Sequence, residues 1–125
     1  MKSKRPIDLP LSQVISVNRS PIAIASILHR ISGIILFLLI PVMLWLLQNS
    51  LASPESFATV FDNVIVRFLA WVFVAAIAYH FVMGIKHLFA DMGMNEELKS
   101  GRTASMVSFV IAAILIVASF VWVMF

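Results

Sequence analysis

Residues 106–125 read MVSFVIAAILIVASFVWVMF and contain no ionisable side chain. A helix needs about 20 residues to cross the roughly 30 Å hydrocarbon layer of a bilayer, so this stretch is long enough to span a membrane. Two further long apolar stretches lie at residues 21–47 and 64–85. The sequence therefore predicts an all-α membrane protein with one membrane-anchor domain: a tail at residues 1–20 and transmembrane helices at about 21–48, 63–90 and 104–125.

The composition favours lipid as the surrounding solvent. Of the 125 residues, 62% are hydrophobic and only 12% are charged, too few charges for a conventional soluble surface. The net charge of +3 forms no basic stripe on a folded face, so nucleic acid is not expected as a partner. There is no cysteine, which excludes in this chain a thiolate-held iron–sulfur cluster and a covalently attached haem. Any redox cofactor must be held non-covalently, through His or Met.

The distribution of basic residues predicts the topology. They concentrate in the N-terminal tail and in residues 86–102, whereas the link at residues 49–62 has no Lys or Arg. The positive-inside rule then places the N-terminus in the cytoplasm and the C-terminus in the periplasm. Trp45 and Trp122 fall near the outer helix ends, where an aromatic belt is expected. The polar tail, with no cleavage site after the first apolar core, predicts no signal peptide.

His80 is the first candidate for chemistry, because an ionisable side chain within a transmembrane helix costs about 2.5–3.5 kcal/mol. It lies roughly 9 Å along the helix from Lys86, too deep to reach the headgroups. Ala76 and Gly84 lie one turn to either side on the same face. Small residues there leave space for a porphyrin, and His is a common axial ligand of haem iron. Helix packing alone would also explain the small residues beside His80. Spacing therefore leaves both haem ligation and helix packing open.

A second polar group lies on the first helix, at a depth similar to that of His80. Ser26, His29 and Arg30 project from neighbouring positions. A guanidinium supplies several directed donors, so Arg30 with Ser26 could bind a haem propionate or a quinone oxygen. The alternative is that Arg30 extends along the helix to the headgroups.

The remaining ionisable residues have less specific interpretations. His87 lies near the helix face of His80 but at the membrane boundary, so it is either a propionate contact or an ordinary interfacial histidine. Arg67 is near the outer boundary, and we expect it to reach the headgroups. Four residues are expected to form a solvated loop or the cap of the third helix: Glu96, Glu97, Lys99 and Arg102.

Two sequence patterns carry a family resemblance. One is Arg5-Pro6 followed later by SILHRISG at residues 26–33; the other is HFVMGIKHL at residues 80–88, followed by Asp91 and Gly93. In this order, with the three-helix plan, the chain resembles the cytochrome b membrane-anchor subunits of succinate dehydrogenase over nearly its whole length. Lys86 departs from the arginine usual in the family, which would offer a forked donor rather than a point charge.

The resemblance implies a subunit of succinate:ubiquinone oxidoreductase, complex II of the tricarboxylic acid cycle and respiratory chain, in the bacterial inner membrane. Its implied partners are a flavoprotein, an iron–sulfur protein and a second membrane anchor, with haem b shared between the anchors. By resemblance, His80 is an axial iron ligand and the other anchor supplies the second. His29, Arg30 and His87 would lie near the propionates, and Ser26 and Arg30 would line the ubiquinone site. No catalytic residue for succinate oxidation is expected in this chain.

The residues leave some alternatives open. Three helices make a bundle too small to enclose haem, so a partner chain is expected on that ground alone, yet spacing does not exclude ligation by His29 and His80 together. A quinol:fumarate reductase anchor would use similar architecture in the opposite direction. A haem-free structural anchor or small transporter subunit would use the polar residues as packing contacts.

Overall fold

The computed structural model describes residues 10–17 and 19–125, and this part of the chain is helical with no strand. The Arg5-Pro6 pattern lies outside the described residues. Three helices are long and apolar enough to cross a membrane, which confirms the predicted all-α architecture with three candidate spans. The elements are α1 (Leu11–Val17), α2 (Pro21–Ser50), α3 (Pro54–Asp62), α4 (Val64–Asp91) and α5 (Leu98–Met124).

Short polar residues begin three of these helices. The Ser20 hydroxyl accepts a hydrogen bond from the backbone N–H of Ala23 at 3.2 Å, and Ser53 accepts from Ser56 at 3.2 Å. Proline follows each of these serines, at the first helical position where its missing N–H costs nothing. Asn63 caps α4 through its side-chain oxygen. These caps satisfy backbone donors that the first turn leaves unpaired.

A glycine turn ends α4 and reverses the chain. Gly93 has φ +86° and donates its N–H to the Ala90 carbonyl at 3.0 Å, while Met94 donates to the Phe89 carbonyl at 2.9 Å. This pair of bonds is the Schellman pattern, in which glycine adopts the left-handed conformation without a Cβ penalty. The turn returns the chain to α5, which begins at Leu98.

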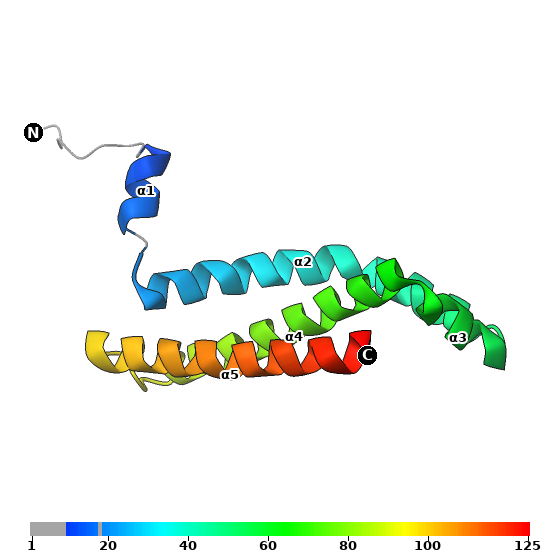
Figure 1. Cartoon of the computed structure of the whole chain (residues 1–125). Helices are drawn as coiled ribbons and strands as arrows, with labels where there is room; N and C mark the ends of the chain where they lie inside the picture. Colours follow the sequence, from blue (N-terminus) through cyan, green and yellow to red (C-terminus); the bar gives the residue numbers. More distant parts are fainter. Residues whose placement is uncertain (1–9, 18) are drawn as a thin grey trace, which may run out of the picture.

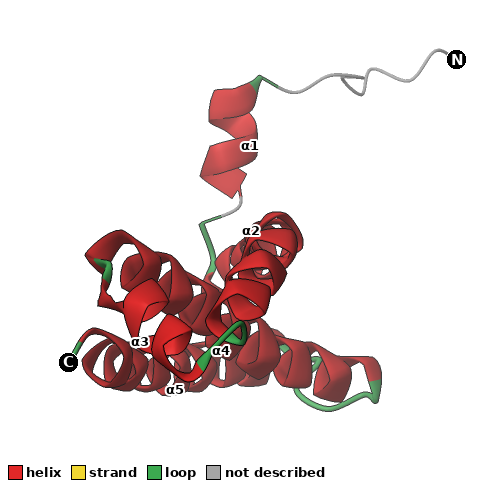
Figure 2. Ribbon diagram, turned by 90° about the vertical axis from the view of Figure 1, so that its right-hand side faces the viewer, coloured by secondary structure: helices red, strands yellow, loops and turns green. Residues whose placement is uncertain are grey.

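The three long helices lie side by side, and consecutive ones run in opposite directions (Figure 1). Helix α4 packs most extensively on α5 and next on α2. Helix α1 projects away from the bundle at the end where α2 begins (Figures 1 and 2). We call this the loop end, because the α4–α5 turn also lies there, and the opposite end, which holds α3 and the C-terminus, the C-terminal end.

The interior of the bundle is made mostly of small side chains together with Met83 and Leu46, and most large apolar side chains face outward. Ala25 and Ser105 are fully buried, whereas Phe37 is 74% exposed and Trp122 is 79% exposed. Small residues let membrane helices approach closely, and lipid solvates the large apolar side chains. Trp45 is likewise exposed. The buried stripe of α5 consists of Gly101, Ser105, Ser108, Ala112 and Ser119.

Helical structure extends beyond the apolar stretches. Helix α1 falls within the segment expected as a tail, and α3 falls within the expected link. Helix α5 begins at Leu98 rather than near residue 104, so Lys99 and Arg102 lie in its first turns, with Glu97 at the N-cap position. Hydropathy marks only the lipid-facing part of a helix, and its polar first turns continue into the interface.

Candidate functional site

Three histidines from two helices gather toward the loop end. The rings of His29 on α2 and His80 on α4 are stacked, with centroids 4.1 Å apart and planes 11° from parallel. The ring of His87 meets that of His29 edge-on at 5.2 Å. The packing of α2 against α4 therefore brings together imidazoles that are about 50 residues apart in the sequence.

Hydrogen bonds hold one nitrogen of His80 against α2. Its Nδ1 lies 3.1 Å from the carbonyl oxygen of His29 and 2.9 Å from the hydroxyl of Ser32. The Ser32 hydroxyl in turn donates to the His29 carbonyl at 2.6 Å. Because a carbonyl oxygen can only accept, the bond to His29 requires the proton to reside on Nδ1. The neutral ring then carries its lone pair on Nε2.

The Nε2 atom of His80 remains available to a partner outside this chain. In the described residues, the fully buried side-chain nitrogens without a hydrogen bond are His29 Nε2 and Arg67 Nε. His80 Nε2 has no hydrogen bond either, so it must reach the surface. Metal coordination takes place in the plane of an imidazole, so His29 stacked on the ring face does not block it.

Gly33 permits the close approach of α2 to His80, whereas Gly84 has room for a methyl group. A Cβ on Gly33 would lie 3.2 Å from Cε1 of His80, and one on Gly84 would lie 3.5 Å from Nε2 of His29. Gly84 shares a helix with His80 but contacts the histidine of the other helix. Sequence reasoning missed Gly33 and Ser32 as neighbours of His80, although both lie in the 26–33 pattern. The available signals were the three- and four-residue separations of Ser32 and Gly33 from His29, which place them near the same helix face, and the hydroxyl of Ser32.

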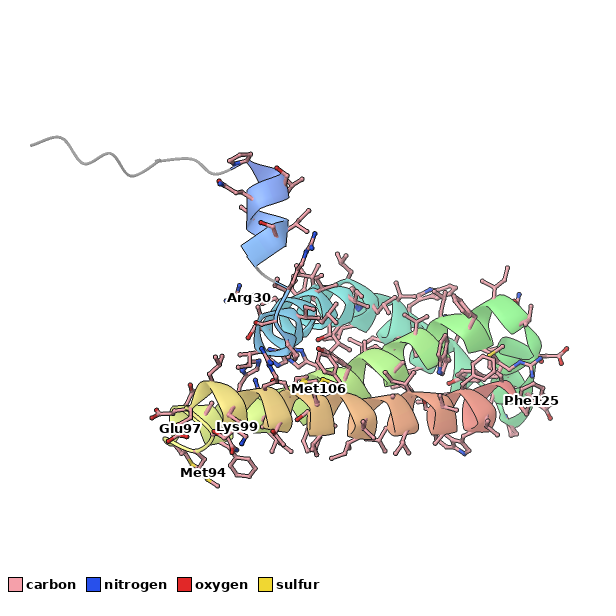
Figure 3. All side chains as sticks on the ribbon, turned by 60° about the vertical axis from the view of Figure 1, so that its left-hand side comes forward. Arg30, Met94, Glu97, Lys99, Met106 and Phe125 are labelled. Carbon is pink, nitrogen blue, oxygen red and sulfur yellow. The ribbon has the colours of Figure 1, made fainter. Side chains whose placement is uncertain are left out.

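Ser26 and Arg30 lie on a different stripe of α2. Ala25 and His29 face α4, since the Ala25 carbonyl accepts from the Tyr79 hydroxyl at 3.2 Å. Ser26 and Arg30 are each one position on, about 100° around the helix. Ser26 is half-buried and Arg30 is exposed, and Figure 3 shows Arg30 on α2 near the point where α1 leaves the bundle.

The Ser26 hydroxyl has no hydrogen bond within the described chain, which sets it apart from other serines. Every other serine of α2, α4 and α5 donates to a backbone carbonyl three or four residues earlier. These are Ser32, Ser50, Ser100, Ser105, Ser108 and Ser119. A half-buried hydroxyl without a partner can donate to a ligand without breaking an existing bond.

Arg67, which was expected to reach the headgroups, contacts the end of α5. It is half-buried, and its Nη1 donates to the carbonyl of Met124 at 3.3 Å, at the end of α5. A cation at a helix C-terminus is favoured by the unpaired carbonyls and the helix dipole there. Sequence spacing does not reveal this contact, because it does not show that the start of α4 meets the end of α5.

A groove of about 870 Å³ runs between α4 and α5 at the loop end. Apolar side chains form most of its wall, and Lys86 and Lys99 border it. A second groove, of about 290 Å³, is bordered by Trp71 and Tyr79. Neither Ser26 nor Arg30 lines these grooves, so the predicted quinone residues lie on a separate surface.

The donor set suits a haem better than a bare metal ion. No group of three or more His, Cys, Asp or Glu in the described residues could hold a metal ion. A porphyrin supplies four iron ligands itself, so one available imidazole nitrogen from a chain is sufficient. His80 Nε2 meets this requirement, and the orphaned His29 Nε2 beside it is a buried polar atom that calls for a partner.

Comparisons with known proteins agree with this architecture. Residues 1–119 match the family model described as succinate dehydrogenase/fumarate reductase transmembrane subunit. The succinate dehydrogenase cytochrome b556 subunit of Coxiella burnetii is 38% identical, over 98% of this chain and 99% of that protein. The subunit of the same name from Paracoccus denitrificans is 33% identical, over 90% and 93%. The resemblance inferred from the sequence is confirmed, and the chain belongs to the succinate dehydrogenase/fumarate reductase transmembrane subunit family.

Proposed function

We propose that this chain anchors a succinate:ubiquinone oxidoreductase in the bacterial inner membrane, holds haem b together with a second anchor subunit, and forms part of the ubiquinone-reduction site. A flavoprotein and an iron–sulfur protein would complete the complex and carry out succinate oxidation. The observation that carries the proposal is His80, whose Nδ1 is bonded to α2 while Nε2 is left for a ligand bond.

Haem b, when bound, supplies a one-electron redox centre beside the quinone site. His80 would hold its iron through Nε2. The ring of His29 would not hold the same iron, because stacked rings present their faces, not their nitrogens, to each other. A further iron ligand would come from the other anchor. His29, His87 and Arg30 would lie near the propionates.

Ser26 and Arg30 would bind the quinone from their own stripe of α2. The Ser26 hydroxyl is unbonded and can donate to a quinone oxygen. Arg30 supplies a fixed positive charge one helical turn away. In a site of low dielectric constant, such donors stabilise the negative charge that develops on the oxygen during reduction. The two residues thus serve binding and electrostatic stabilisation.

The haem assignment is tested on the complex purified from native membranes. The wild-type complex should show a b-type haem spectrum, and His80→Leu should remove the haem or change its spin state. Succinate oxidation with an artificial electron acceptor should continue in this variant, because the soluble subunits perform it. A wild-type complex without haem under full cofactor supply would favour a haem-free anchor instead.

The quinone assignment is tested by Ser26→Ala in the same complex. We expect a normal haem spectrum with impaired quinone reduction, since the variant removes a hydrogen bond worth about 0.5–1.5 kcal/mol. Arg30→Leu should affect both quinone turnover and the haem spectrum, because its long side chain would reach both ligands. Wild-type quinone kinetics in Ser26→Ala would show that Ser26 only packs.

Two further parts of the proposal have their own measurements. A reporter fused after Phe125 should lie in the periplasm and one inserted near Lys99 in the cytoplasm; the reverse result would overturn the orientation. Because the family description also includes fumarate reductase, the rates of succinate:quinone and quinol:fumarate turnover decide between the two directions. The relatives named above favour the first.

A further inference from the structure

The hydroxyl of Ser32 lies between the ring of His80 and the backbone carbonyl of His29. Ser32 is buried, with 6% of its surface exposed, and its hydroxyl lies 2.9 Å from His80 Nδ1 and 2.6 Å from the His29 carbonyl. The hydroxyl donates to the carbonyl, so its lone pairs are left for the Nδ1 proton. Ser32 therefore completes a three-membered network across the α2–α4 interface.

We infer that Ser32 is a positioning residue for the haem ligand, which fixes the ring plane and the proton position of His80; this inference rests on the proposed function. A histidine that binds a metal commonly donates its other N–H to an oxygen, which sets the tautomer and makes the ligating nitrogen more basic. Here two oxygens surround the Nδ1 proton. The His29 carbonyl supplies one acceptor, and Ser32 supplies the second.

The bond between His80 and Ser32 should affect both how tightly the haem is bound and the midpoint potential of its iron. A more basic imidazole donates more charge and stabilises the oxidised iron more than the reduced iron. Loss of the Ser32 hydroxyl should therefore make the midpoint potential of the haem more positive. It should also loosen the ring, because Nδ1 would be held by the His29 carbonyl alone.

A purely structural role for Ser32 is a specific alternative. Serines in helices often donate to a preceding carbonyl for no reason beyond satisfying the hydroxyl. Ser50 provides the matched case: it lies on the same helix, is 4% exposed, and donates to the Leu47 carbonyl three residues earlier at 2.8 Å. It differs from Ser32 in having no hydrogen bond to a histidine. Any effect specific to Ser32 must then come from its contact with His80.

The experiment compares Ser32→Ala with Ser50→Ala in the complete complex. The readouts are haem content after a detergent wash, the electron paramagnetic resonance g-values of the oxidised haem, and its midpoint potential. Ser32→Ala should lower haem affinity by about tenfold, the low end of the range for such outer contacts because the His29 carbonyl remains. Its potential should rise and its g-values should change, while Ser50→Ala should match the wild type. Equal haem properties in the two variants would overturn the inference.

A second variant separates the hydroxyl from the shape of the side chain. Ser32→Thr keeps a hydroxyl that can reach the preceding carbonyl in a helix, so it should restore the wild-type potential and g-values; a result like that of alanine would contradict the inference. His80→Leu distinguishes the two proposals. An unchanged haem in that variant refutes the ligand assignment itself. Loss of haem there, with wild-type haem properties in Ser32→Ala, refutes only the role of Ser32.

Discussion

Helix α4 carries Arg67 and His80 within its apolar stretch, and the bundle uses them in opposite ways. Arg67 lies near the C-terminal end and directs its guanidinium inward to the last turn of α5. His80 lies roughly 20 Å further along the helix. It turns one nitrogen inward to α2 and leaves the other without a partner in the chain.

This difference shows how a structural residue can be told from a ligand-binding one. Both residues are costly to place in a membrane helix, so both are functional candidates by sequence alone. The distinction lies in what remains after the internal bonds are made. Arg67 bonds the end of α5 through Nη1 and encloses its Nε, and a guanidinium has no lone pair to offer a metal, whereas His80 Nε2 is accessible and carries one.

Arg67→Met should have the largest effect on stability and none on the haem. Hydrogen bonds from charged donors contribute about 1.5–3 kcal/mol, and we expect a loss near 2 kcal/mol because Nε has no bond to lose. The measurement is thermal unfolding of the detergent-solubilised complex alongside its haem spectrum. Arg67→Lys is the control, with a smaller loss because it keeps the charge. A changed haem spectrum at full haem occupancy would show that Arg67 is not purely structural and that its end of α4 also affects the haem.

Gly33→Ala and Gly84→Ala form a matched pair at the histidine end. The new Cβ at Gly33 would lie 3.2 Å from His80 Cε1, so the ring must shift, whereas at Gly84 it would make ordinary contact with His29 at 3.5 Å. We expect Gly33→Ala to lower haem affinity by about tenfold, equivalent to about 1.4 kcal/mol. Gly84→Ala should retain its haem. Haem content per complex is the measurement, and equal retention would mean that the ring position is not critical.

Tyr79→Phe should have the smallest effect, although Tyr79 is one residue from His80. It removes the bond from the Tyr79 hydroxyl to the Ala25 carbonyl, typically worth about 0.5–1.5 kcal/mol. At 3.2 Å we expect a loss of about 0.5 kcal/mol in thermal stability, with unchanged haem content and quinone kinetics. A loss of haem in this variant would show that the α2–α4 contact as a whole, rather than the bonds to Nδ1, positions His80.

Hydropathy predicted the three long helices, because each must present about 20 apolar residues to lipid. It did not predict α1 or α3, which are short and partly polar. The repeated Ser-Pro pairs at residues 20–21 and 53–54 were the local signal for two helix starts. We expected α5 to start later, because Lys99 and Arg102 were interpreted as part of a loop. Charged residues are, however, compatible with the first turns of a helix in the membrane interface.

The candidate site was predictable in its residue types but not in its contacts. His80 was singled out because an imidazole deep in a span is costly. Which groups surround it depends on the rotation of α2 against α4, and a single sequence contains no direct record of that angle. The same limit applies to Arg67, whose partner belongs to a helix more than 50 residues away.

The small-residue interior has a consequence for sequence divergence. In a soluble protein, buried positions require large apolar side chains and the surface varies most. Here the positions that face lipid can exchange Leu, Ile, Val and Phe with little cost, since lipid accommodates any of these shapes. Interior positions such as Gly101 have little room, because a Cβ there would lie 3.1 Å from both the Asn95 carbonyl and Ile22, so these neighbours would have to move by a few tenths of an ångström. The chain should therefore tolerate mutation in the opposite pattern to a soluble bundle, with its strictest positions being its smallest residues.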